Sequence, residues 1–354
     1  MPGRRMAAVD AQSYWTSAKI PNDEFLLYAF DGEPEDLDRA VDQICRRARV
    51  CPGLTIRVED GWALTYPRWV PAPVGPERVI CHDLADRSWH GCLAALSDLF
   101  ADQLDIRRTP WRVHLFTSVT GIPRCTGTGT VAAVQVPHAL ADGARGSAMA
   151  AWLFGREAPV PELERLRAGF LPCRAFDATR THRRMLRDIE AGLLVAPLAP
   201  RPPLSTNARP EGTRSIRTLV RQRSQLRGPT VTVSVLTAVS AALSKLLGPE
   251  AESLGAEVPI AKLGVPHAYN HFGNVVVGLH PTLGLGDRAE RIAADLANGR
   301  RRFEHPATRS ADRAFAAMPA ALLRWGISQF DPNVQPVQVA GNTVVSSVNR
   351  GAAD

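Results

Sequence analysis

A proline-rich stretch near the middle of the chain limits what this sequence can fold into. Residues 195–212 read VAPLAPRPPLSTNARPEG and hold five prolines, and proline cannot continue a helix. Such a stretch favours an extended, exposed connection. The chain has 354 residues, enough for two domains of ordinary size. We therefore expect a first domain over 1–194, a linker over 195–212 and a second domain over 213–354.

Strand and helix patterns alternate on both sides of this linker. In the first half, periodicity predicts strands over 24–31, 54–58, 112–119 and 128–136, and helices over 34–47, 88–105 and 143–154. In the second half it predicts strands near 215–221 and 257–262, an apolar run over 274–283, a final strand over 343–348, and helices from 232, over 287–304 and over 310–328. This order predicts two mixed α/β domains with a ligand cleft between them.

Composition excludes several classes of protein. The first residues lack the pattern of an export signal, and the longest apolar tract, 233–248, is too short and too rich in Ser and Thr to cross a bilayer. That tract predicts a buried core helix, and we expect a cytoplasmic protein. The six cysteines lack metal-ligand spacing, so we expect reduced thiols and no metal.

The net charge of +7 comes almost wholly from arginine. A basic surface can attract nucleic acid, anionic lipid or a phosphorylated cofactor, or it can be a solvated face without a partner. The arginines are dispersed along the chain, without the dense stripe typical of nucleic-acid binders, so we expect no nucleic-acid partner. Charge alone does not distinguish a surface for lipid or for a cofactor from a solvated face.

The stretch VQVPHALADGARG, residues 134–146, holds the clearest chemical motif. His138 stands between a predicted strand and a predicted helix, and Asp142 and Gly143 complete the pattern H-x-x-x-D-G. A histidine with a pKa near neutrality can take a proton from a hydroxyl or an amine. Asp142 can brace the loop, and Gly143 suits a tight turn. The alternative is a passive loop histidine followed by an Asp that caps the helix, and the motif alone leaves both open.

Four further segments give the motif a context. They are MAAVDAQSYW at the start of the chain, TPWRVHL at 109–115, NHFGN at 270–274 and VSSV at 345–348. In this order, and with H-x-x-x-D-G between them, they resemble the bacterial wax ester synthase / diacylglycerol acyltransferase family of the H-H-x-x-x-D-G acyltransferase superfamily. The resemblance covers nearly the whole chain. It implies two chloramphenicol-acetyltransferase-like domains, α/β with mixed sheets, and an active-site tunnel between them.

The resemblance also implies a reaction. An O-acyltransferase of this family transfers a fatty acyl group from acyl-CoA to diacylglycerol or a long-chain alcohol, which yields triacylglycerol or wax ester and free CoA. His138 would be the general base, Asp142 would hold the loop through an arginine, and Gly143 would keep the tunnel open. Acyl-CoA would be a substrate, no separate cofactor is implied, and such an enzyme would work at a lipid droplet or at the inner face of the membrane.

Candidate substrate contacts follow from the same matches. They are Pro137, Trp111, Asn270 and Asn274. Three of them have a plainer explanation: a Trp such as Trp111 commonly packs in a core, and the two asparagines can satisfy the backbone of a turn. His267 and His271 have a spacing that would suit zinc on a helix. Pro266 and Gly273 bracket that pair, so we expect a polar loop there.

The sequence departs from the family in three places. Pro137 replaces the first histidine of the family motif, Thr232-Val233 replaces an Asn-Asp pair at the start of a helix that Thr232 can cap, and SSVNRGAAD replaces the family's S-N-V-P-G-P. We expect a second domain that is incomplete relative to the family. Two further hypotheses stay open: transfer from a carrier-protein thioester, and a non-catalytic homologue that binds acyl-CoA or lipid.

Overall fold

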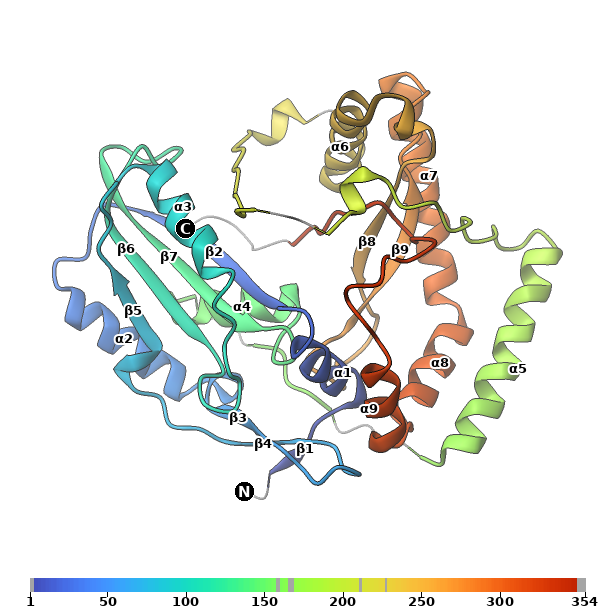
Figure 1. Ribbon diagram of the computed structural model, residues 1–354, viewed down its shortest axis with the longest axis horizontal. Helices are drawn as coiled ribbons and strands as arrows, with labels where there is room; N and C mark the ends of the chain where they lie inside the picture. The colour runs from blue at the N-terminus through green and yellow to red at the C-terminus, as the bar shows by residue number, and fades with distance from the viewer. Residues whose placement is uncertain (1–2, 157–159, 165–168, 210–211, 227, 349–354) are drawn as a thin grey trace.

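The chain folds around two separate sheets, one on each side of residues 195–212 (Figure 1). The computed structural model describes residues 3–156, 160–164, 169–209, 212–226 and 228–348. In the first half, four strands have the order β2 (Asp23–Asp31), β7 (Thr128–Pro137), β6 (Arg112–Thr120) and β5 (Val79–His82). The central strand β7 is antiparallel to both β2 and β6, and β5 runs parallel to β6.

Helices cover both faces of this first sheet. Leu26, Leu115 and Val134 face one core with α2 (Leu37–Arg49) and α4 (Gly143–Leu153), whereas Phe116 and Val131 face a second core under α3 (Trp89–Leu99). Alternate side chains of a strand point to opposite faces, so a sheet covered on both faces needs apolar residues at almost every position. This accounts for β7, which is buried from its second residue to its last.

The second half contains a smaller sheet with the order β10 (Thr343–Val344), β8 (Gly255–Ala261) and β9 (Phe272–Gly278). Helices α6 (Val231–Leu247) and α7 (Leu285–Glu304) pack around it, and a separate hydrophobic core lies between them. A third small sheet, in the first half, joins β1 (Arg4–Arg5), β4 (Arg68–Pro71) and β3 (Ile56–Glu59).

The two halves meet around the first helix, α1 (Ala8–Ser17), which lies between them in Figure 1. It contacts α8 (Pro306–Ala316) and α9 (Ala320–Ser328) of the second half. Tyr269, Ala320 and Leu323 are buried in the core of the first half. The second half therefore contributes side chains to the first core, although each half has a sheet of its own.

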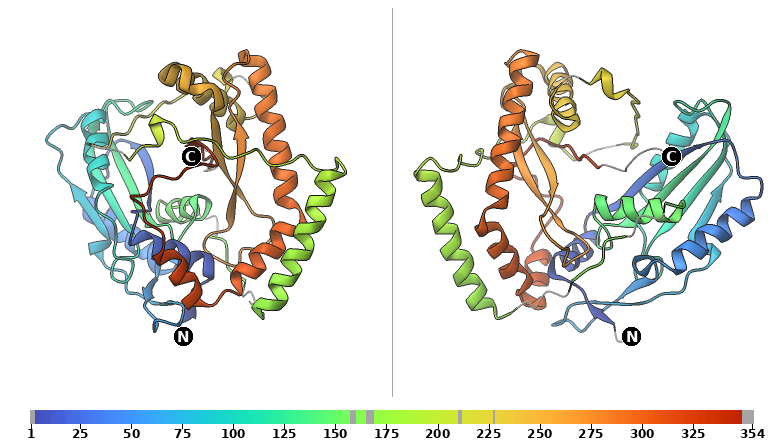
Figure 2. Two further views of the ribbon diagram at one scale, coloured as in Figure 1. Left: turned by 45° about the vertical axis from the view of Figure 1, so that its right-hand side comes forward. Right: turned by 180° about the vertical axis from the view of Figure 1, so that it is seen from behind.

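Helix α5 (Leu171–Glu190) was not predicted, and it forms the outer edge of the molecule beside α8 (Figures 1 and 2). The predicted boundaries assign it to the first domain, yet it packs on the second half. In the predicted linker, Arg201 is buried and its backbone pairs with Val339, so this part of the linker lies against the second half. The predicted boundaries at 194 and 213 stay predictions.

Three predicted elements of the second half differ from the structure. Residues 215–221 form no strand. Their alternating apolar and polar residues predict one, but no described strand lies beside them to pair with their backbone. The predicted helix 310–328 is two helices, α8 and α9, and Pro319 stands at the N-cap of the second. In the predicted strand 343–348, only Thr343 and Val344 pair, parallel to β8.

Helix α6 begins one residue before the position predicted for it. Thr230, and not Thr232, caps it by accepting a hydrogen bond from Val233 N at 3.2 Å. The segment Val231–Ser253 is the one described helix long and apolar enough to cross a membrane by length and composition. Val233, Leu236 and Ser240 are nevertheless buried against the second sheet, so the prediction of a core helix holds for one face of α6.

A buried polar network ties the end of β2 to the middle of the first sheet. His82 Nε2 bonds to His114 Nδ1 at 2.9 Å, His114 Nε2 bonds to Gln135 Oε1 at 2.9 Å, and Gln135 Nε2 donates to Asp23 Oδ2 at 2.7 Å. Because the Gln135 oxygen accepts, His114 carries its proton on Nε2. Burial lowers the pKa of His114 to about 4, so the ring is neutral near pH 7. Both of its nitrogens then have a hydrogen-bond partner, Nδ1 as an acceptor and Nε2 as a donor.

We expect this network to make the fold acid-sensitive. The pKa of His114 lies below its ordinary value, so the unfolded chain binds the proton first and stability falls as the pH drops from 6.5 to about 4. The loss from this residue amounts to at most about 3 kcal/mol. Urea unfolding at pH 7.5 and pH 5 measures it. His114→Gln should be less stable at pH 7.5 but should lose less between the two pH values, and an equal loss in both proteins would contradict the assignment.

Candidate active site

His138 stands in the turn that leaves β7. Leu140 N donates to Pro137 O at 2.8 Å and closes the turn, and Pro137 is the last residue of the strand, paired with Asp23 of β2. The His138 ring folds back over the turn, so that Nδ1 lies 3.0 Å from Ala141 O and 3.1 Å from Glu24 Oε1. Nδ1 faces two oxygen acceptors and therefore carries the proton. The other nitrogen, Nε2, bonds to no described residue, and the His138 side chain as a whole is 27% exposed.

Glu24 was not predicted as a site residue. It lies on β2 directly opposite Val136, two positions before His138, and its carboxylate is the nearest charge to the ring. Burial lowers the pKa of His138, but the Glu24 carboxylate, the Ala141 carbonyl and the charge of Asp142 together outweigh it, and the pKa lies above its ordinary value. The sequence offers no local signal for Glu24, because the strand pairing that brings it to His138 joins two distant parts of the chain.

Residues of the second half cover one face of the His138 ring. Phe272, the first residue of β9, stacks on the His138 ring with 5.6 Å between ring centroids and 22° between ring planes. The neighbouring residue, His271, donates its backbone N–H to Asp142 Oδ2 at 2.9 Å. The imidazole is therefore held between the two halves, with its proton directed to the first half and a ring face covered by the second.

Asp142 holds the loop in a different way from the one predicted. Its Oδ1 accepts from Arg145 N at 2.9 Å and caps α4, while Oδ2 accepts from His271 N. The resemblance implies an arginine that pairs with Asp142, but Arg145 meets this carboxylate only with its backbone N–H. Its guanidinium lies over the Tyr269 ring at 4.5 Å and donates to Pro161 O. Asp142 therefore does both things that the sequence left open: it caps α4, and it fixes the loop that holds His138.

Asn270 connects the second half to the loop that holds His138, and Asp10 in turn binds Asn270. The amide Nδ2 of Asn270 donates to His138 O at 2.7 Å and to Asp10 Oδ1 at 3.0 Å. Asp10, on α1, also accepts from the backbone N–H groups of Tyr269 and Asn270 at 3.0 and 2.9 Å. Burial raises the pKa of Asp10 to about 6 although these three donors lower it. Asp10 was not predicted; a carboxylate inside the apolar opening segment is the signal that marks it.

The remaining predicted residues lie at different distances from this site. Gly143 begins α4, and a side-chain carbon there would lie 3.1 Å from the Val348 side chain, so a larger residue is disfavoured. Trp111 is fully buried and donates Nε1–H to Leu54 O at 2.8 Å, as expected of a tryptophan that packs in a core. Asn274 is exposed on β9 and bonds to Glu257, so the structure does not bring it to His138.

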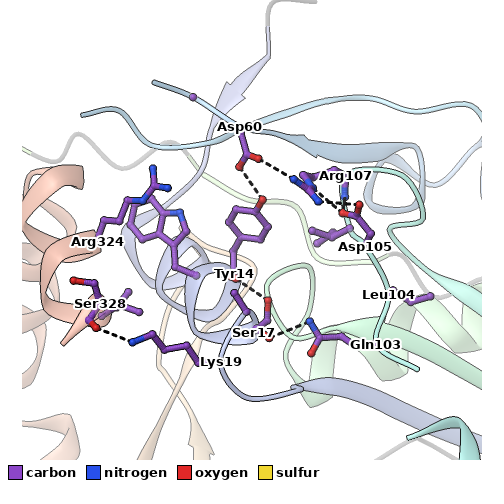
Figure 3. A pocket seen from close by; sticks show the side chains of 15 residues that line it. Tyr14, Ser17, Lys19, Asp60, Gln103, Leu104, Asp105, Arg107, Arg324 and Ser328 are labelled. Atoms are coloured by element: carbon purple, nitrogen blue, oxygen red, sulfur yellow. Dashed lines mark hydrogen bonds and ion pairs between the residues drawn. The ribbon is translucent and has the colours of Figure 1, made fainter. Parts of the chain in front are cut away.

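Two cavities lie where the halves meet, on the two ends of α1. One, of about 560 Å³, is lined by residues 3–9, by Asn270 and His271 of the loop behind His138, and by Asp312 and Phe315 of α8. The other, of about 650 Å³, lies between the end of α1, the loop 103–107 and α9. Figure 3 shows its polar wall, where Tyr14, Asp60 and Arg107 are joined in a row. Both volumes are typical of small-molecule sites.

The first of these cavities contains polar atoms without protein partners. Asn270 Oδ1, His271 Nε2 and His267 Nδ1 are buried and make no hydrogen bond. The pair His267 and His271 lies in a loop between β8 and β9, and in the described parts of the chain no group of three His, Cys, Asp or Glu side chains could hold a metal ion. A ligand or solvent in this cavity would meet two imidazoles and an amide oxygen beside the loop that holds His138.

Several solved structures share the fold of this chain, whereas no family model and no curated protein sequence matches it. The wax ester synthase/diacylglycerol acyltransferase from Marinobacter aquaeolei VT8 aligns with a TM-score of 0.59 and 20% identity, over 97% of this chain and 81% of that one. The first condensation domain of the CDA synthetase aligns with a TM-score of 0.53 and 14% identity, over 85% and 74% of the two chains.

A variant of the starter condensation domain of the rhizomide synthetase, in complex with C8-CoA and Leu-SNAC, aligns with a TM-score of 0.54 and 12% identity, over 97% of this chain and 78% of that one. These similarities establish a shared fold. They confirm the predicted fold class, a mixed α/β protein with two chloramphenicol-acetyltransferase-like halves, and the predicted likeness to the wax ester synthase/diacylglycerol acyltransferase fold.

We expect Asp10 to be essential for the junction of the two halves. Asp10→Ala leaves three buried donors without an acceptor, which should reduce the free energy of unfolding by about 3 kcal/mol or more. Urea denaturation measures this. Asp98→Ala, at an exposed position of α3 whose side chain bonds to no described residue, is the control and should change stability by less than about 0.5 kcal/mol. Equal stability of the two variants would contradict the role of Asp10.

Proposed function

We propose that this protein is an acyltransferase of the wax ester synthase / diacylglycerol acyltransferase type, with His138 as its general base. The observation that carries the proposal is the state of the imidazole: its Nδ1 is directed to Ala141 O and Glu24, its Nε2 bonds to no described residue, and the side chain is 27% exposed. A base must present an unprotonated nitrogen to a substrate, and this arrangement supplies one. The shared fold supports the same reaction class.

In the proposed reaction, His138 both accepts and returns the proton that is transferred. His138 Nε2 takes the proton from the hydroxyl of diacylglycerol or a long-chain alcohol, and the oxygen attacks the thioester carbonyl of acyl-CoA. The carbon–sulfur bond breaks, the CoA sulfur leaves, and the proton returns from the imidazolium to that sulfur. The products are an ester and free CoA. Glu24 and the Asp142 carboxylate favour the transient imidazolium because both are negative charges close to the ring.

The cavities beside α1 are the proposed places for the two substrates. The cavity behind the catalytic loop combines the apolar Met6, Ala8 and Phe315 with the polar Asn270 and His271, which suits a chain that ends in a polar group. A cytoplasmic protein in peripheral contact with a membrane or lipid droplet fits a lipid acceptor. That location remains a prediction, and so does the absence of a separate cofactor.

We expect His138→Ala to abolish transfer without loss of fold. Free CoA, detected by its thiol, should be released when the purified protein is given a long-chain acyl-CoA with diacylglycerol or a fatty alcohol. The variant should be slower by about 100- to 10,000-fold, the usual contribution of a general base. His90→Ala, at an exposed histidine of α3, is the matched control and should retain activity. No release with any alcohol from folded wild-type protein would reject the proposal.

The same assay distinguishes transfer from CoA from two further hypotheses. If an acyl group on a carrier-protein thioester is transferred faster than the same group on CoA, the donor is a carrier protein. A non-catalytic homologue would bind acyl-CoA without turnover, and His138→Ala would leave that binding unchanged.

We expect Glu24→Gln to shift the pH dependence of the reaction. The pKa of His138 is raised, so the fraction of free base, and with it kcat/KM, should fall as the pH drops through that raised value. Removing the Glu24 charge lowers the pKa of His138, and the acidic limb should move to lower pH. Glu33→Gln, at an exposed loop position, should leave the limb in place. An unchanged limb in Glu24→Gln would show that Glu24 does not set the protonation of His138.

A further inference from the structure

Helix α5 packs on the molecule with one face and leaves the opposite face exposed. The helix is 20 residues long and none of its side chains is fully buried. Leu171, Ala178, Met185 and Ile189 are half-buried, and they recur at steps of seven and four residues, so they share one face. This face packs on α8, where Asp188 also pairs with His305 at 3.2 Å. The opposite face points away from the molecule, at its outer edge (Figures 1 and 2).

The outward face combines one aromatic ring with a group of cations. Phe176, Arg180, Arg183 and Arg187 follow one another at steps of four, three and four residues, which places them on a single side of the helix. Arg184 lies next to them, and all five side chains are exposed. The four arginines form no ion pair with any described residue. Asp177 and Glu190 lie at the edges of this face, so the charges at its centre are all positive.

Apolar side chains flank the basic face at both ends of the helix. Phe170 precedes α5 and Leu193 and Val195 follow it, with exposed fractions of 70%, 71% and 53%. Phe176, at the centre, is 71% exposed. Exposed apolar side chains of this size are costly in water, and next to arginines they are typical of helices that lie in a membrane interface.

We propose that α5 and its flanking residues 170 and 193–195, which we call the α5 surface, bind an anionic lipid surface. The arginines would contact phosphate headgroups, and Phe176, Phe170 and Leu193 would enter the acyl-chain boundary. Nucleic acid fits less well, because Leu193 and Val195 gain nothing from stacking on bases. The proposal deepens the proposed function, since it names where an enzyme with a lipid acceptor meets its membrane, but it is measured without any acyl transfer.

Co-sedimentation of the full chain with lipid vesicles tests the α5 surface. The protein should bind vesicles that contain phosphatidylglycerol, bind pure phosphatidylcholine weakly, and lose part of its binding at high salt. The triple variant Arg180→Glu, Arg183→Glu, Arg187→Glu should reduce partitioning roughly 100-fold. Phe176→Ser should reduce it by roughly tenfold, and chiefly the part that persists at high salt.

A second triple variant is the matched control. Arg39→Glu, Arg46→Glu and Arg68→Glu change the net charge by the same amount, at exposed positions of α2 and β4 in the first half. This variant should bind vesicles within a few-fold of the wild type. If it loses as much binding as the α5 variant, overall charge governs binding and the proposal is overturned. Failure of the folded wild type to bind anionic vesicles overturns it too.

A spectroscopic measurement covers the case in which the charge-reversed variant does not fold. Phe176→Cys, with the exposed Cys81 and Cys173 changed to Ser, carries an environment-sensitive dye on the outward face. Its emission should shift to the blue when anionic vesicles are added, and an unshifted spectrum with bound protein would show that another surface is in contact. Because neither measurement needs acyl-CoA, an inactive protein can still confirm or reject the α5 surface.

Discussion

The arrangement of the candidate site depends on one buried carboxylate, that of Asp10. It belongs to the first helix, yet its three hydrogen-bond donors belong to Tyr269 and Asn270, in the second half of the chain. The Asn270 side chain, held by Asp10, in turn donates a hydrogen bond to the His138 carbonyl. A carboxylate excluded from water must be paired, so the halves cannot separate here without a large cost. The raised pKa of Asp10 shows how strongly burial opposes its charge.

Each half contributes a different property to His138. Glu24 and Ala141, from the first half, determine which nitrogen carries the proton and raise the pKa of the ring. Phe272, from the second half, covers one face of the ring, and His271 fixes Asp142 at the start of α4. The turn after β7 alone would present a histidine in solvent. Contact with the second half covers one face of a ring that the first half already orients.

The candidate site around His138 and the proposed α5 surface differ in how their charged residues are arranged. Around His138 the charges are few, partly buried and paired, which suits proton transfer. On the outward face of α5 four exposed arginines lie close together, and this suits attraction to an anionic surface. The arginines are dispersed in the sequence, but helical spacing collects several of them on one face.

The sequence by itself determined the long periodic elements, the order of the two α/β halves and the position of His138 between a strand and a helix, because these depend on local spacing of apolar residues. It missed α5, whose half-buried face is too narrow to dominate the pattern, and it predicted a strand over 215–221 that has no partner. Glu24, Asp10 and Phe272 became site residues only in the tertiary structure. Their contacts with residues 138 and 269–270 join distant parts of the chain, and no local pattern encodes which distant strands and loops will pack together.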